Sequence, residues 1–195
     1  MTPGGARAGY PVLLAGACAF LLVLPFVATF NDFLTAGVVA LGFSGPVQAV
    51  ANVEAHMVVR LLSLLGVGAG VASNGYLVVW PGTARAQTLY ISWNCIGWQS
   101  LILLGISLVS GLRGNYTWPA RVQVALLGVL GTIFVNLFRV TCVCLLAALA
   151  GRLPAVIFHD YGGTLLIVVW LFAFWAVADR WILGDPLPER APQAA

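Results

Sequence analysis

The sequence predicts an all-α polytopic membrane protein with four to six transmembrane helices, an interfacial helix and a small extracytoplasmic β-hairpin. Of its 195 residues, 61% are hydrophobic and only 8% are charged, whereas a soluble domain carries about 25% charged residues. Several uncharged stretches are long enough to cross a hydrocarbon core of about 30 Å as helices. The basic residues are nine arginines without a lysine, and the net charge of +3 forms no basic face for nucleic acid.

The first apolar stretch, residues 10–30, contains no charged residue and is flanked by Arg7 and Asp32. As a helix it would be about 31 Å long, which suffices for one span. A cleaved signal peptide is the alternative interpretation. The stretch is long for a signal peptide, and no small-residue cleavage site closes it.

Three further apolar runs predict spans over residues 96–112, 122–150 and 161–178. The run 122–150 contains a single charged residue, Arg139. The polar, proline-rich tail 181–195 is expected to be disordered. We therefore expect one membrane-embedded domain over residues 1–195, with its core at about 57–178.

Residues 46–66 show the periodicity of a helix with one apolar side. The apolar residues of that side are Val47, Val50, Ala51, Met57, Val58, Leu61, Leu64 and Leu65. Glu54, His56 and Arg60 lie in the middle of the segment, which favours an interfacial amphipathic helix over a span. Two additional crossings, near 33–52 and 57–73, are the alternative.

A β-hairpin is predicted further along the chain. Asn74-Gly75 is a turn signal beside β-branched and aromatic residues. The strands are expected near 76–80 and 88–93, outside the bilayer.

The arginines predict the orientation of the chain. Arg113 and Arg121 share one short connection, which places that connection in the cytoplasm. With an even number of spans both chain ends also lie inside, and residues near 31–94 and 150–160 emerge outside. The sequence thus predicts a multi-pass protein of the cytoplasmic (cell) membrane with its site on the extracytoplasmic side.

This topology brings three reactive side chains to one depth near the outer boundary. Cys95 begins the span 96–112, His159 precedes the last span, and Arg139 lies about 25 Å along a helix that starts inside. A thiolate is a strong nucleophile, and a helix N-terminus or a nearby cation favours its formation. His159 could exchange the thiol proton, and Arg139 could stabilise an oxyanion.

Four neighbouring residues could support these groups. Ser92 or Asn94 could cap the helix that Cys95 opens. Asn136, three residues before the arginine, could fix its guanidinium. Gln99, four residues after the cysteine, could face the site or pack against another helix.

Structural interpretations of the same residues stay open. Arg139 could reach to the outer headgroups, Cys95 could be an inert apolar residue, and His159 could form a solvated loop pair with Asp160. The remaining cysteines, Cys18, Cys142 and Cys144, are expected to be inert, and the spacing fits neither a disulfide framework nor a metal site. No metal or organic cofactor is implied, because Cys, His and Arg suffice for acyl transfer.

The segments WNCIGWQS (93–100) and NLFR (136–139), followed by His159, resemble the exosortase/archaeosortase family of membrane cysteine transpeptidases. That family carries a Cys-x-Gly motif opening a span, an Asn-x-x-Arg motif near the end of the next, and a His before the last. The strand-like segment ahead of Cys95 is also similar. The resemblance covers about residues 57–178.

The resemblance implies a thiol protease or transpeptidase that acts outside the cytoplasmic membrane. Its substrate would be a membrane protein with a C-terminal sorting signal: a short motif, a transmembrane helix and a basic tail. Cleavage would pass through a thioester, and the product would go to a lipid or other acceptor. The implied roles are nucleophile for Cys95, acid and base for His159, and electrostatic partner for Arg139.

A non-catalytic membrane assembly subunit or scaffold is the alternative function. The 22 glycines would let helices approach closely, and Arg139 would pair across an interface. A transporter comes third, since one intramembrane cation without a mid-membrane carboxylate offers little for ion coupling.

Overall fold

The computed structural model describes residues 25–26, 29–72, 76–80 and 86–184. The chain divides into two compact units, Met1–Phe43 and Ser44–Ala195. The described part of the first unit is mainly the helix Thr29–Ala40. The predicted span 10–30 lies largely outside the described residues.

The second unit is mostly helical. Its α-helices are α2 (Ser44–Leu64), α3 (Trp98–Gly111), α4 (Trp118–Ala150), α5 (Arg152–Ile157) and α6 (Gly163–Ala178). Three short helical turns accompany them: η2 (Trp93–Ile96) precedes α3, η3 (Phe158–Gly162) joins α5 to α6, and η4 (Asp179–Leu183) follows α6.

Among the described residues, three helical segments are long and apolar enough to cross a membrane: Trp93–Gly111, Trp118–Ala150 and Arg152–Leu183. A fourth is reached if Thr29–Ala40 and Ser44–Leu64 are counted as one broken span. The predicted class, an all-α membrane protein with a small sheet, is confirmed.

The last helical segment differs from its predicted limits at both ends. It begins at Arg152 rather than near residue 161, because Pro154 falls in the first helical turn, where a missing N–H costs nothing. His159 therefore lies within a helical turn rather than in a loop. The segment ends at Leu183, so 181–183 are helical, and residues 185–195 of the predicted tail lie outside the described residues.

A three-stranded antiparallel sheet precedes η2, with the order β1 (Ala69–Val71), β2 (Tyr76–Val79) and β3 (Gln87–Tyr90). The hairpin β2–β3 is the predicted one, and its register pairs Tyr76 with Tyr90. Strand β1 was not predicted, because Ala-Gly-Val has no alternation that marks a strand. The predicted turn Asn74-Gly75 lies outside the described residues.

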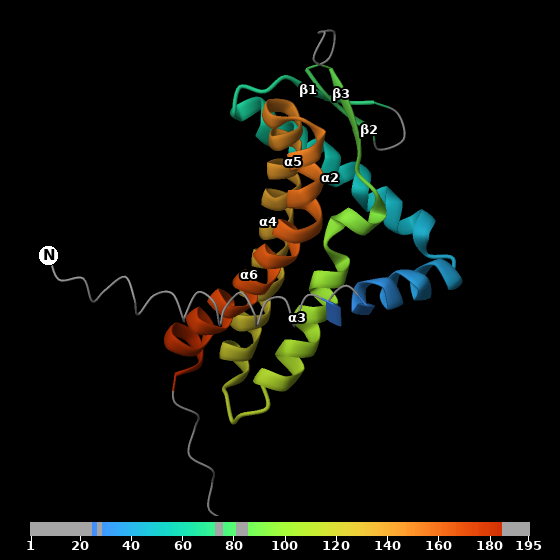
Figure 1. Cartoon of the computed structure of the whole chain (residues 1–195). Coiled ribbons are helices and arrows are strands. Elements are labelled where there is room, and N and C mark those ends of the chain that lie inside the picture. The colour runs from blue at the N-terminus through green and yellow to red at the C-terminus, as the bar shows by residue number, and fades with distance from the viewer. Residues whose placement is uncertain (1–24, 27–28, 73–75, 81–85, 185–195) are drawn as a thin grey trace, which may run out of the picture. The chain divides into compact units, whose positions relative to one another are not determined.

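Helix α4 contributes to two apolar cores, and Figure 1 shows its ribbon running beside that of α6. The first core joins α2, the sheet and the C-terminal half of α4 through Ala51, Val58, Leu62, Leu77, Val79, Val140 and Cys144. The second joins α3, the N-terminal half of α4 and α6 through Leu104, Val124, Phe174 and Ala178. Two buried polar residues of α4, Thr132 and Asn136, lie in the stretch between Val124 and Val140.

The buried face of α2 overlaps the predicted apolar side only in part. Of that side, Ala51 and Val58 are buried, whereas Val50, Met57, Leu64 and Leu65 are exposed. The helix also buries Ala55 and Leu62. Lipid accommodates large apolar side chains as well as a protein core does, so apolar residues such as Val50 and Met57 can lie outside the core. This orientation turns Glu54 toward α4.

Candidate active site

The structure brings the three predicted site residues together from three elements. Cys95 lies in η2, Arg139 in α4 and His159 in η3. The Sγ atom of Cys95 is 3.6 Å from Nε2 of His159. The guanidinium of Arg139 donates through Nη2 to the main-chain carbonyl of His159 over 3.3 Å. A thiol, an imidazole and a guanidinium thus share one site.

The turn η2 holds Cys95 just before the transmembrane helix α3. Ser92 is its N-cap, and the Ser92 hydroxyl accepts a 3.3 Å hydrogen bond from the main-chain N–H of Asn94. Of the two predicted caps, Ser92 is therefore the one observed. The rings of Trp93 and Trp98 stack at a centroid distance of 6.0 Å, one on each side of Cys95 in the sequence.

Gly97 joins η2 to α3 in a conformation that favours glycine. Its φ angle is 76°, in the left-handed region. A Cβ atom at this position would also lie 2.7 Å from Cγ of Asn136. The glycine therefore allows both the sharp turn after Cys95 and the close approach of α4.

Asn136 anchors the turn that carries the thiol. Its side chain is 2% exposed, and its Nδ2 atom donates over 2.8 Å to the main-chain carbonyl of Cys95 and over 2.8 Å to Oε1 of Glu54. We predicted that Asn136 would fix the guanidinium of Arg139. It instead binds the main chain of the cysteine, because Gly97 lets that carbonyl come within reach.

Arg139 makes a comparable contact with the main chain of His159. Asn136 and Arg139 lie three residues apart on one face of α4. The first donates to the carbonyl of Cys95, and the second donates to the carbonyl of His159. Gly163, at the start of α6, makes room for the arginine, since a Cβ there would overlap Nε of Arg139. One helix thus holds the main-chain carbonyls of both Cys95 and His159.

His159 is oriented through both of its ring nitrogens. Nε2 faces the thiol, and Nδ1 lies 3.0 Å from Oδ1 of Asp160. The imidazole is 39% exposed and the carboxylate 56% exposed. Asp160 was predicted only as a partner in a solvated loop pair. The arrangement of thiol, imidazole and carboxylate is one in which the imidazole can accept a proton and be stabilised as a cation.

Two residues of α2 belong to the site and were missed from the sequence. Glu54 accepts the hydrogen bond from Asn136 described above. Gln48 donates to the carbonyl of Ile91 over 3.1 Å and accepts from the N–H of Trp93 over 2.9 Å. The available signal was a carboxylate and an amide within an apolar helix, and from the sequence Glu54 indicates only an interfacial amphipathic helix.

Gln99 lies in the first turn of α3, four residues after Cys95, and is partly buried. Its supporting role stays a prediction.

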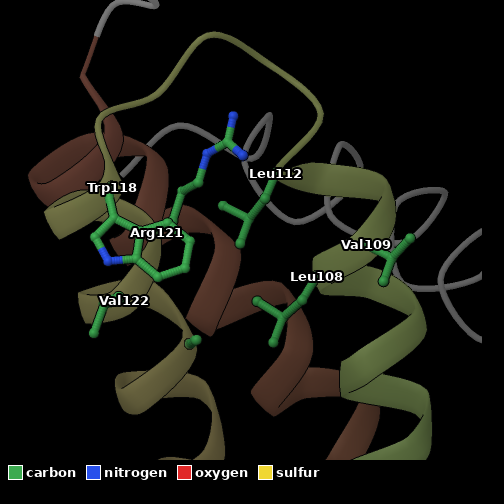
Figure 2. A pocket seen from close by; sticks show the side chains of 7 residues that line it. Leu108, Val109, Leu112, Trp118, Arg121 and Val122 are labelled. Atoms are coloured by element: carbon green, nitrogen blue, oxygen red, sulfur yellow. The ribbon is translucent and has the colours of Figure 1, made fainter.

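A separate pocket of about 400 Å³ lies where α3 connects to α4, and Figure 2 shows its lining. Leu108, Leu112 and Val122 form apolar walls, and Trp118 lies beside Arg121. Arg121 of α4 donates to the carbonyl of Gly114 and so ties the α3–α4 connection to the start of α4. None of the three site residues lines this pocket, which lies toward the opposite end of α4 from Arg139.

A sequence model of the transmembrane exosortase family matches residues 3–176. The match covers most of the chain and includes the residues that resemble the family's motifs. Comparisons with curated proteins and with solved structures found no match. The length of the family match shows that this chain belongs to the transmembrane exosortase family.

Proposed function

We propose that this protein is a membrane cysteine transpeptidase or protease that cleaves a C-terminal sorting signal of exported membrane proteins. The observation that carries the proposal is the 3.6 Å approach of Cys95 Sγ to His159 Nε2, two atoms from residues 64 positions apart. Family membership supports the same activity. The site would face the extracytoplasmic side, where the motif of an exported substrate becomes accessible.

In the first half of the reaction, His159 takes the proton of the Cys95 thiol, and the thiolate attacks the scissile carbonyl carbon. A sulfur–carbon bond forms, and the negative charge moves to the carbonyl oxygen. Arg139 stabilises this oxyanion through guanidinium N–H donors held in a fixed plane. The carbon–nitrogen bond then breaks, and His159 returns its proton to the leaving amine. The product is a thioester on Cys95.

In the second half, an acceptor nucleophile attacks the thioester carbonyl, and the sulfur–carbon bond breaks. His159 removes the proton of the acceptor and restores the thiol. A lipid or another anchor gives transfer, and water gives hydrolysis, since both pass through the same thioester.

The test uses host cells, where every natural substrate is present. The chromosomal gene is replaced by the Cys95→Ala variant or by the Cys142→Ala control. The C-terminal peptides of membrane proteins are then quantified by mass spectrometry. Proteins that end in a motif, an apolar helix and a basic tail should keep this tail in Cys95→Ala cells and lose it in Cys142→Ala cells. Equal processing in both strains, with equal protein levels, would refute the proposal and favour a scaffold.

A further inference from the structure

A second pocket, of about 220 Å³, lies beside the turn that carries Cys95. Residues of α2, η2, α3 and α4 line it, and one of them is Ile96, the direct neighbour of the cysteine. We call it the junction pocket and define it by Val53, Glu54, Met57, Trp98, Ile133 and Asn136. Val53, Met57 and Ile133 are exposed apolar residues, so the pocket opens toward the outer surface of this unit.

Three polar residues of the junction pocket each have a buried atom that finds no hydrogen-bond partner among the described residues. These atoms are Oε2 of Glu54, Oδ1 of Asn136 and Nε1 of Trp98. The amide orientation of Asn136 is fixed, because its Nδ2 atom already donates to Glu54 and to the carbonyl of Cys95. Buried polar atoms without a partner cost free energy, and apolar surroundings raise that cost.

The unpartnered atoms comprise oxygen atoms of a carboxyl and an amide together with one indole N–H donor. A lipid acyl chain would leave all three without a partner. A polypeptide offers both N–H donors and carbonyl acceptors. Its N–H groups are free where a helix begins, and its carbonyls are free in the extended segment just before that helix. The first four N–H groups of a helix have no partner within that helix, and the helix N-terminus carries a partial positive charge. A carboxylate and an amide oxygen match that end of a helix.

From these observations we propose that the junction pocket binds the substrate segment in which the sorting motif passes into the transmembrane helix. Main-chain N–H groups of the segment donate to Glu54 and Asn136, and a carbonyl accepts from Trp98. An aliphatic side chain of the segment packs against Val53, Met57 and Ile133. This inference rests on the proposed function, since it assigns a subsite for the same substrate. It also gives α2 a role in recognition as well as in support.

The position of the pocket fits this occupant. Asn136 lines the junction pocket and also donates to the carbonyl of Cys95, and Ile96, the residue after the cysteine, lines the pocket as well. Leu101 of α3 and Ile133 of α4 extend the apolar lining along both helices. The transmembrane part of a substrate can therefore continue beside these helices while its motif reaches the thiol.

The first test is photo-crosslinking in host cells, with p-benzoylphenylalanine at position 53 of a Cys95→Ala protein. Val169 on α6 provides the matched control, since Val53 is 61% exposed and Val169 is 54% exposed, and α6 does not line the pocket. Crosslinked peptides are identified by mass spectrometry. Position 53 should be joined to the motif–helix junction of tailed proteins, and position 169 should not. Products joined only to lipid, or equal products from both positions, would overturn the proposal.

The second test is Glu54→Gln, measured with a tailed protein whose processing depends on Cys95. The glutamine oxygen keeps the hydrogen bond from Asn136 and places an amide donor where the second carboxylate oxygen was. KM should rise by roughly tenfold or more, with a much smaller change in kcat. A fall in kcat at constant KM would instead show that Glu54 only positions Asn136.

The two proposals fail separately. If tailed proteins crosslink at position 53 but Cys95→Ala cells process them normally, substrate binding in the junction pocket is supported and the proposed reaction is refuted. If processing requires Cys95 while position 53 contacts only lipid and Glu54→Gln changes neither KM nor kcat, the proposed reaction is supported and the proposed subsite is refuted.

Discussion

A Cβ atom at Gly97 would lie 2.7 Å from Cγ of Asn136, so only a glycine at this position leaves room for the asparagine of α4. The two residues come from the Cys-x-Gly and Asn-x-x-Arg segments, 39 positions apart in the chain. Their contact explains why the first segment carries a glycine and the second an asparagine. The glycine lets α4 approach, and the asparagine then holds the carbonyl of Cys95.

Gly97→Ala should therefore reduce cleavage by at least tenfold. The alanine is strained by about 1–2 kcal/mol at a positive φ, and it pushes Asn136 away from Cys95. Gly105→Ala is the control, since a Cβ at Gly105 in the same helical segment has no described neighbour within 4 Å. Cleavage rates and thermal unfolding in detergent are measured for both. Equal cleavage by the two variants would contradict the role of the contact.

The imidazole should control the reactivity of the thiol. In a protein that keeps only Cys95, with Cys18, Cys142 and Cys144 changed to serine, His159→Gln should slow alkylation at neutral pH by about tenfold, because the thiol loses its proton acceptor. The reagent is a membrane-impermeant maleimide added to intact cells. His56→Gln is the control, as His56 only contacts the carbonyl of Asn52 on an exposed face of α2. An unreactive thiol in the folded parent protein, or equal alkylation rates in both variants, would contradict the control of Cys95 by His159.

Asp160 should act through His159. Asp160→Asn removes the charge beside Nδ1 and should lower kcat by about tenfold while KM stays constant. The loss should be modest, because both side chains are more than one-third exposed and water screens their interaction. Asp179→Asn, in η4, is the control. A rise in KM instead would mean that Asp160 contacts the substrate.

Gln48 should stabilise the segment before Cys95. Gln48→Ala removes two hydrogen bonds to the main chain at Ile91 and Trp93 and should lower the free energy of unfolding by about 1–3 kcal/mol. Gln123→Ala, on an exposed position of α4, should change stability little. Tm in detergent gives the comparison. A Tm equal to that of the Gln123 variant would show that α2 does not support this segment.

The sequence was sufficient to predict the parts of the fold that depend on composition and length. Long apolar runs identified the helices α3, α4 and α6, because a membrane requires about twenty apolar residues in a row. Residue spacing then placed Cys95, Arg139 and His159 at one depth, and these three residues do lie together. Limits of elements were less predictable, as Pro154 shows, because a proline is compatible with the first turn of a helix.

The contribution of α2 could not be predicted in the same way. In a soluble protein an apolar stripe marks the buried face, and the charged residues mark the solvated one. Next to lipid that rule does not hold, so Val50 and Leu64 are exposed while Glu54 faces Asn136. Only the tertiary structure shows which polar residue of α2 faces α4. The same limit hid Gln48, whose partners are main-chain atoms that no side-chain pattern reveals.

Asn136 and Arg139 hold the carbonyls of Cys95 and His159 from one turn of α4. The separation of these two anchoring residues along α4 is set by the rise of three helical residues, about 4.5 Å. If α4 slides along its axis or rotates, both anchors move together. A displacement of this one helix would therefore act on the main chain at Cys95 and at His159 together.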